Sequence, residues 1–355
     1  MEEAEDIHQM NRRMDIYKII KIYQRIKSPK LKLLGLLTLH TLRRRYLYIS
    51  MDPALACNLR CKLCYFSNPE AEKELHGVFS NEDIQTIARS LFHRGLKLQI
   101  GCGAEPTTYK GLANIVKTAK EHGIPHISIT TNGNLLSFPL LQELVENGLD
   151  ELIVSVHGLK AETYERMMTG ARFDRFVQLV EDVARIRGKH PSFRFRVNYT
   201  ICADNVDDLS LFPKVFAEVK PNVIQLRPVQ DIGSTAYTNY SLKELAETYD
   251  RHMTPVLAFC RENGITCLYP DKTNLECINE ENEQHEHTNS AVDMLPLFYL
   301  SPRKGWREGF DPYRETFEQF SKRTRRGRSM LRTLLTGTQP EAQYNTTKAL
   351  NYNIG

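Results

Sequence analysis

Short apolar runs alternate with amphipathic segments through the middle of the chain. The apolar runs predict strands at residues 46–51, 97–102, 126–130, 151–156, 193–200 and 223–227, with a further short strand at 265–269. The amphipathic segments predict helices at residues 80–95, 111–122, 138–148, 173–187, 207–218 and 241–263. Strands that alternate with helices indicate a parallel sheet covered by helices. Six such units in a row favour an α/β fold built on a partial (βα)6 TIM-like barrel, in which functional residues lie at the carboxyl ends of the strands.

The two ends of the chain have a different pattern. Residues 1–45 predict a basic helical extension: Ile16, Ile19, Ile20 and Tyr23 recur at helical spacing, and residues 31–42 are rich in leucine between flanking lysines and arginines. We expect these helices to pack on the surface of the barrel, with association with a membrane surface or a partner as the alternatives.

Beyond residue 271 the βα pattern fades. Residues 296–300 predict a strand, residues 314–335 a helical run with a basic cluster, and the last twenty residues a tail. We therefore expect three regions: the extension at 1–45, the barrel at 46–270, and a C-terminal α+β region at 271–355 that covers the mouth of the barrel.

Composition narrows the class of protein. The chain has 355 residues, of which 41% are hydrophobic and 25% charged, as in ordinary globular proteins. No apolar run reaches the roughly 20 residues of a membrane span, and the acidic first ten residues lack the apolar stretch of a secretory signal. The net charge of +4 does not by itself indicate nucleic acid binding, and we interpret the basic residues 322–332 as a solvated helix face rather than a site for RNA or an acidic peptide.

Three of the eight cysteines lie within eight residues: Cys57, Cys61 and Cys64, in a loop directly after the first predicted strand. This spacing indicates metal ligation in a reducing compartment, from which we infer a cytoplasmic location. The three thiolates can bind one face of an iron–sulfur cube, which usually takes four cysteines. The absence of a fourth local cysteine leaves one iron open for chemistry, unless a distant cysteine completes a closed electron-transfer site. A structural zinc site is the remaining alternative.

The CxxxCxxC spacing, followed by the aromatic Tyr65, resembles the radical S-adenosylmethionine (SAM) superfamily. The resemblance covers roughly residues 46–270. It implies a [4Fe–4S] cluster on the three cysteines, with SAM chelating the open iron and Tyr65 packing near its adenine.

Loops after the later strands extend the resemblance. The sequence Gly103-Ala104-Glu105 before Pro106 is similar to the family's Gly-Gly-Glu-Pro element, which binds the amino group of SAM. Further SAM contacts implied by motif or position are Thr131, Asn132, Ser155, His157, Asn198 and Arg227; His157 stands where the family usually has aspartate. An imidazole can still hydrogen-bond a ribose hydroxyl.

The implied activity is the reductive cleavage of SAM to a 5′-deoxyadenosyl radical, which abstracts hydrogen from a substrate. An external electron donor of the flavodoxin or ferredoxin type would supply the electron. The leading expectation for the substrate is a peptide or protein, as in the SPASM/twitch-related branch. The alternatives are a small molecule (a sugar, nucleoside or lipid precursor) or a non-catalytic iron–sulfur or zinc protein.

The C-terminal region lacks the full cysteine set of auxiliary clusters. Cys260, Cys267 and Cys277, with His285 and His287 close behind, could form a small metal site, although buried thiols and solvated histidines are the simpler interpretation.

Overall fold

The computed structural model describes residues 22–23, 25–230, 235–272, 275, 297–303 and 309–337, and the backbone of 353–354. The predicted helical spacing at Ile16, Ile19 and Ile20, most of the tail, and the candidate ligands Cys277, His285 and His287 lie outside these residues. No described helix is both long and apolar enough to cross a membrane.

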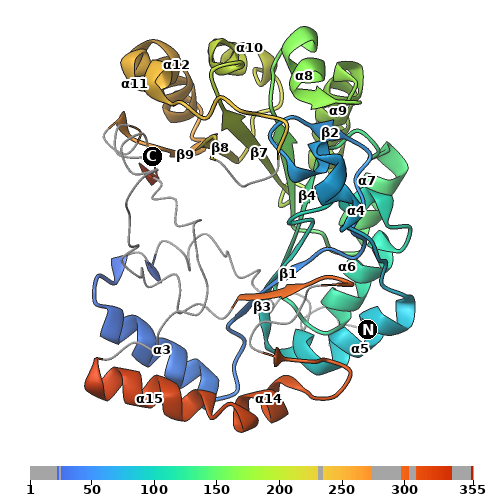
Figure 1. Cartoon of the computed structure of the whole chain (residues 1–355), viewed down its shortest axis with the longest axis vertical. Coiled ribbons are helices and arrows are strands. Elements are labelled where there is room, and N and C mark those ends of the chain that lie inside the picture. The colour runs from blue at the N-terminus through green and yellow to red at the C-terminus, as the bar shows by residue number, and fades with distance from the viewer. Residues whose placement is uncertain are drawn as a thin grey trace.

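A single curved sheet forms the centre of the described structure, and helices cover its outer side (Figure 1). All six predicted barrel strands are present and adjacent, which confirms the α/β fold and the partial barrel. The predicted strands near residues 265–269 and 296–300 lengthen the sheet at its two edges. Every neighbouring pair is parallel except β11 and β9. The order is β10 (Leu297–Leu300), β1 (Leu47–Met51), β3 (Gly95–Ile100), β4 (His126–Thr131), β5 (Glu151–Val156), β7 (Arg194–Ile201), β8 (Val223–Pro228), β9 (Thr266–Tyr269) and β11 (Asn353–Ile354).

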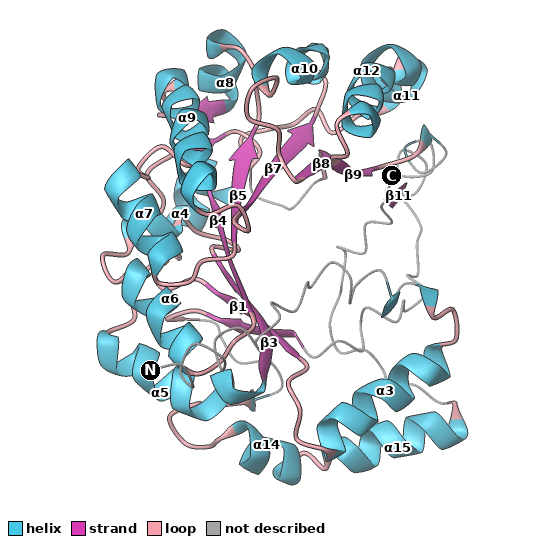
Figure 2. Cartoon of the chain, turned by 180° about the vertical axis from the view of Figure 1, so that it is seen from behind, coloured by secondary structure: helices cyan, strands magenta, loops and turns pink. Residues whose placement is uncertain are grey.

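The helices that cover the sheet follow the predicted segments closely on the N-terminal side of the barrel (Figure 2). Ser80 forms a capping box with Asp83 at the start of its helix, as expected from the sequence. A short helix that the sequence pattern did not predict, α8, lies between β5 and α9. The covering helices are α5 (Asn81–Leu91), α6 (Leu112–Glu121), α7 (Phe138–Glu146), α8 (Ala161–Met167), α9 (Phe173–Lys189), α11 (Lys243–Glu247) and α12 (Tyr249–Glu262).

Three predicted helices differ from the structure. Residues 207–218 are mostly a 3-10 helix (Val206–Leu211) followed by the short α10 (Phe212–Val215), because Asp208 turns inward and accepts hydrogen bonds from the 159–163 segment. The segment 241–263 divides at Thr248 into α11 and α12. The C-terminal run divides into α14 (Phe317–Arg323) and α15 (Arg326–Thr336), because Arg325 adopts a left-handed conformation with φ 51°.

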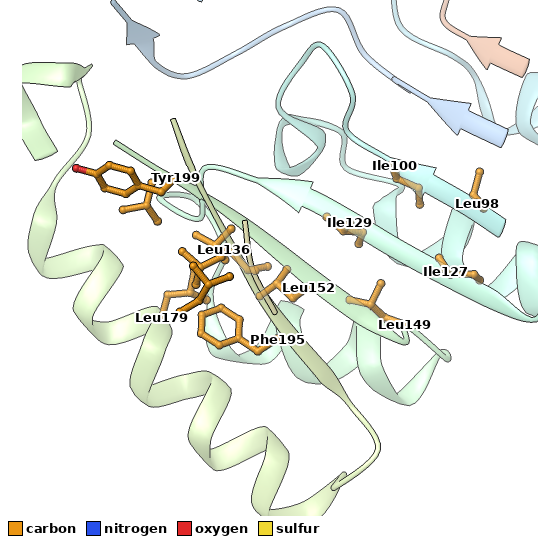
Figure 3. Packing of buried hydrophobic residues seen from close by; sticks show 14 of the residues in the cluster. Leu98, Ile100, Ile127, Ile129, Leu136, Leu149, Leu152, Leu179, Phe195 and Tyr199 are labelled. Atoms are coloured by element: carbon orange, nitrogen blue, oxygen red, sulfur yellow. The ribbon is translucent and has the colours of Figure 1, made fainter. Parts of the chain in front are cut away.

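The two faces of the sheet have different chemistry because side chains alternate along a strand. Residues such as Leu98, Ile127, Leu152 and Phe195 belong to the hydrophobic core under the outer helices, and Leu179 of α9 lies close to Phe195 (Figure 3). The intervening positions are polar: Gln99 bonds Thr130, and Arg196 bonds Asn198 and Gln225. The inner face of the partial barrel is therefore a polar surface that leads to the carboxyl ends of the strands. The division of the chain into three regions stays a prediction.

Candidate active site

The cysteine loop begins after β1 and is fixed by a segment distant in the sequence. β2 (Arg60–Cys61) pairs antiparallel with β6 (Met168–Thr169), and the amide of Lys62 donates to the carbonyl of Met167 at 2.9 Å. Arg60 also forms an ion pair with Glu72 of α4 (Pro69–Lys73). The conformation of the loop is thus set by the fold rather than by a bound ion alone.

The three thiols of this loop are half-buried and form no disulfide. Burial raises the pKa of Cys57 to about 11 and also raises the pKa values of Cys61 and Cys64; the charges of Cys57 and Cys64 add to the shift at Cys61. The thiols are therefore close enough to affect one another, and they need a positive metal centre to ionise at neutral pH.

Two observations test which metal these cysteines fit. No three His, Cys, Asp or Glu side chains of the described residues surround a single ion. Thiolates on one zinc lie only about 4 Å apart, whereas those on one face of a cluster are spread more widely. The donor set, three sulfurs in one half-buried loop, fits a [4Fe–4S] cluster with an open iron better than it fits a single zinc ion.

Glu105 joins the loop after β3 to the loop after β4. Its Oε1 accepts from Thr131 Oγ1 at 2.6 Å and from the amide and hydroxyl of Thr107 at 3.1 and 2.5 Å, and its Oε2 accepts from the amide of Asn132 at 2.8 Å. Burial raises the pKa of Glu105, and these donors act against the shift. The Glu105 amide also donates to the carbonyl of Ala56 at 2.9 Å, beside the cysteine loop. Glu105 therefore holds its own loop, after β3, to the loop after β4 and to the cysteine loop after β1.

Asn132 completes this joint on the side of the cysteines. Its Nδ2 donates to Asn58 Oδ1 at 2.9 Å and lies 4.0 Å from Cys57 Sγ. The predicted residues Cys57, Glu105, Thr131 and Asn132 thus lie together, although they come from three different strand ends.

Gly103 and Ala104 are held by a residue that the motif analysis missed. Asp52, fully buried directly after β1, accepts from the amides of Cys102, Gly103 and Ala104 at 2.7, 2.9 and 3.3 Å. Tyr299 of β10 donates its hydroxyl to the same carboxylate at 2.7 Å, and the Tyr65 hydroxyl donates to the carbonyl of Gly103. The signal in the sequence was an acidic residue at the carboxyl end of the first strand.

The remaining predicted residues form a second group on β5, β7 and β8. Ser155, Asn198 and Gln225 are aligned in one row of the sheet. Gln225 Oε1 accepts from both Arg196 and Arg227, and Arg196 Nε donates to Asn198 Oδ1 at 2.9 Å. Three of the four predicted residues in this group are therefore connected: Ser155 pairs with Asn198 across β5 and β7, and Arg227 bonds Gln225, which pairs with Asn198 across β7 and β8.

His157, just beyond β5, is the fourth. Burial and the charge of Arg227 lower its pKa to about 4, so the imidazole is neutral at physiological pH. Its Nδ1 is buried and has no hydrogen-bond partner in the described part of the chain. Buried polar atoms are normally satisfied, so this nitrogen fits a polar group of a bound ligand such as a ribose hydroxyl.

The part of the chain that contains this site is similar to known proteins. Residues 51–200 match the family model described as "Radical SAM superfamily". A probable GTP 3′,8-cyclase of Saccharolobus islandicus is 28% identical over 199 residues, which cover 55% of this chain and 62% of that protein. The corresponding protein of Sulfurisphaera tokodaii is 28% identical over 194 residues, covering 54% and 59%. The chain thus spans less than two thirds of the length of these relatives.

Among solved structures, the chain resembles Streptococcus suis SuiB bound to S-adenosylmethionine, with a TM-score of 0.54 and 18% identity over 74% of this chain and 60% of SuiB. This likeness shows a shared fold. The family match assigns residues 51–200, which contain the three cysteines and the loops that meet beside them, to the radical SAM superfamily.

Proposed function

We propose that this chain is a radical SAM enzyme that abstracts hydrogen from a small anionic molecule, with a nucleotide as the leading candidate. The observation that carries the proposal is the meeting of Cys57, Glu105 and Asn132, from three successive strand ends, beside the three thiols. This arrangement brings the cysteine loop after β1, proposed to hold the cluster, next to the loop at Gly103–Glu105, proposed to bind SAM.

Each residue has a distinct part in this proposal. Cys57, Cys61 and Cys64 would hold a [4Fe–4S] cluster, which together with SAM would supply the radical chemistry of hydrogen abstraction. The peptide groups at Gly103 and Ala104, held by Asp52, bind the amino group of SAM.

The second group binds the rest of the cofactor. Ser155, Asn198 and Arg227 bind its carboxylate and ribose, and the neutral imidazole of His157 accepts or donates a hydrogen bond there. Tyr65 packs beside the adenine. The described residues orient the cofactor, while the chemistry of bond cleavage belongs to the cluster and SAM.

The charge of the inner barrel face supports an anionic substrate. Lys97 and Arg196 lie on this polar face. Burial lowers the pKa of Lys97, and Arg196 donates to the neutral side-chain amides of Asn198 and Gln225. The facing carboxylate is Glu151; although burial opposes it, a hydrogen bond from His126 and the charges of Lys97 and Arg196 lower its pKa to about 2. Arg196 and Arg227 both donate to the neutral amide of Gln225, and positive charge beside this group suits a phosphate-bearing substrate.

The relatives favour a small molecule over the peptide that the sequence pattern placed first. Both relatives are named as cyclases of GTP, a nucleotide. The likeness to SuiB, at 18% identity, concerns the fold and gives no support to a peptide substrate. We further propose a flavodoxin- or ferredoxin-type electron donor and a reducing, cytoplasmic setting.

The test is anaerobic reconstitution with iron and sulfide, followed by dithionite, SAM and a panel of nucleotides that includes GTP. We expect 5′-deoxyadenosine to form, with faster formation when the correct nucleotide is present. Cys57→Ala should abolish it, while Cys260→Ala, which removes a buried thiol of α12 outside the site, should not. A bound cluster without SAM cleavage under any condition would overturn the enzymatic proposal, and stimulation by peptides alone would overturn the substrate class.

A further inference from the structure

The leucine-rich α3 (Pro29–Thr41) and the basic α15 come from opposite ends of the chain and pack side by side at one end of the structure (Figures 1 and 2). Gly327 permits this approach, since a Cβ there would lie 3.3 Å from the ring of His40. The His40 ring also hydrogen-bonds Ser321 at 3.1 Å. Two segments that look unrelated in the sequence therefore form one surface.

This surface exposes large apolar side chains. On α3, Leu31 and Leu34 are 59 and 45% exposed, and Leu42, directly after the last residue of this helix, is 62% exposed. On α15, Leu331 and Leu335, four residues apart, are 46 and 74% exposed. Five exposed leucines on two adjacent helices exceed the scattered apolar residues that a monomer surface normally shows.

The same helices are cationic. Neither α3 nor α15 contains an acidic residue, and both carry or adjoin several basic ones. Arg43 follows α3 and Arg325 precedes α15, both with φ near 50°, a conformation that disfavours residues other than glycine or asparagine. The exposed cations are Lys30, Arg43, Arg44, Lys322, Arg325, Arg328 and Arg332.

A pocket of about 800 Å³ lies where the end of α3, the helix α14 and the start of α15 meet. Arg43, Lys322, Arg325 and Arg328 contribute to its lining. Its one acidic residue, Glu318, already pairs with His93 at 2.8 Å and Arg94 at 3.1 Å. The pocket therefore offers positive charge of the kind that binds phosphate.

From these features we propose that the α3–α15 surface docks the protein on a membrane that contains anionic lipids. We define this surface by Leu31, Leu34, Leu42, Arg43, Lys322, Arg325, Arg328, Leu331, Arg332 and Leu335. The leucines enter the interface between headgroups and acyl chains, the cations contact lipid phosphates, and a headgroup occupies the pocket.

Apolar and basic residues on one surface fit this partner better than RNA. Single-stranded RNA is bound through aromatic side chains that stack on bases, and α3 and α15 contain none. Exposed leucines gain nothing from a phosphate backbone, whereas a lipid surface buries them. The proposal does not depend on the proposed enzymatic function.

The test is flotation of the full chain with vesicles, without SAM. We expect binding to vesicles in which about a third of the phosphatidylcholine is replaced by phosphatidylglycerol, and binding that weakens with salt. Each cation near an anionic surface raises the affinity for the vesicle roughly fivefold. The triple variant Arg325→Gln/Arg328→Gln/Arg332→Gln should therefore bind anionic vesicles about 100-fold more weakly. The variant Leu331→Ser/Leu335→Ser should lose on the order of tenfold in vesicle affinity, because it buries less apolar area in the lipid.

Matched controls are exposed residues elsewhere: Leu135→Ser/Val177→Ser for the leucines and Lys117→Gln/Arg175→Gln/Lys189→Gln for the cations. These should bind vesicles as the unaltered chain does, and circular dichroism checks that every variant is folded. Equal binding to neutral vesicles, equal loss in the controls, or no vesicle binding by the unaltered chain would overturn the proposal. A salt-dependent complex with tRNA in the absence of vesicle binding would instead identify the surface as an RNA site.

Discussion

The hydrogen bond between Tyr299 and Asp52 links the edge strand β10 to the loop that we propose binds SAM. Tyr299→Phe removes one hydroxyl and leaves the ring in place. The Asp52 carboxylate is fully buried and would keep three amide donors, at 2.7, 2.9 and 3.3 Å, but would lose the 2.7 Å hydroxyl donor. Because a hydrogen bond to a charged group contributes about 1.5–3 kcal/mol, we expect a loss of about 2 kcal/mol in the free energy of unfolding.

Asp52→Asn perturbs the same group from the other side. Each carboxylate oxygen accepts two of the four donors, so an amide nitrogen in place of either oxygen removes the acceptor from two. If the nitrogen replaces Oδ2, the Tyr299 hydroxyl can rotate and accept, but the Gly103 amide is left without a partner. An unsatisfied buried donor costs about 1–3 kcal/mol, and removing the buried charge recovers part of this. We therefore expect a net loss of about 2 kcal/mol and weaker SAM binding.

Urea denaturation followed by circular dichroism measures both single variants and the double variant. Both changes affect the bond between Tyr299 and Asp52: Tyr299→Phe removes its hydroxyl, and Asp52→Asn removes the charge that strengthens it. The double variant should therefore be less destabilised than the sum of the singles by about 1–2 kcal/mol.

Tyr313→Phe is a matched control. Its hydroxyl donates to Asp83 at 2.6 Å on an exposed surface, where the loss should stay below about 1 kcal/mol. If Tyr299→Phe costs no more than Tyr313→Phe, or if the two site changes are additive, the reasoning is refuted.

Three further predictions concern single residues. Glu105→Ala should retain the cluster absorbance but weaken SAM binding by at least about tenfold, because the joint between the loops loses its charged acceptor; unchanged affinity in calorimetry would contradict this. The pKa of His157 is lowered to about 4, so protonation of this buried imidazole opposes folding at low pH. The free energy of unfolding should therefore fall by on the order of 2 kcal/mol as the pH drops from 6.5 toward 4. In His157→Asn the urea midpoint should depend less on pH over this range. Gly133→Ala places a Cβ 2.4 Å from Leu179 at φ +76° and should cost about 1–3 kcal/mol in thermal unfolding, whereas Gly188→Ala on α9, with open space around it, should not destabilise.

The barrel could be predicted because each strand and helix carries its own local pattern. The runs at 126–130 and 151–156 became β4 and β5 almost residue for residue, since each is a short, mostly apolar run that is buried along nearly its whole length, as in a covered parallel sheet. Prediction failed where a tertiary contact outweighed the local pattern. Asp208 turns inward toward the 159–163 segment, so residues 206–211 wind as a 3-10 helix, and Arg325 turns left-handed where a continuous helix was expected.

For the site, the sequence by itself determined which three thiols share a loop: the spacing of Cys57, Cys61 and Cys64 is local, and it predicts them as the cluster ligands. Only the tertiary structure decided what holds them. Asp52 and Tyr299 are 247 positions apart, and Met167 supports the cysteine loop from beyond β5, because the parallel strands gather their carboxyl ends at one edge. The same holds for α3 and α15, which form one apolar and cationic surface only after the chain has folded. Local spacing can specify which atoms bind a metal, but long-range contacts depend on which strands and helices become neighbours, and no short stretch of sequence contains that information.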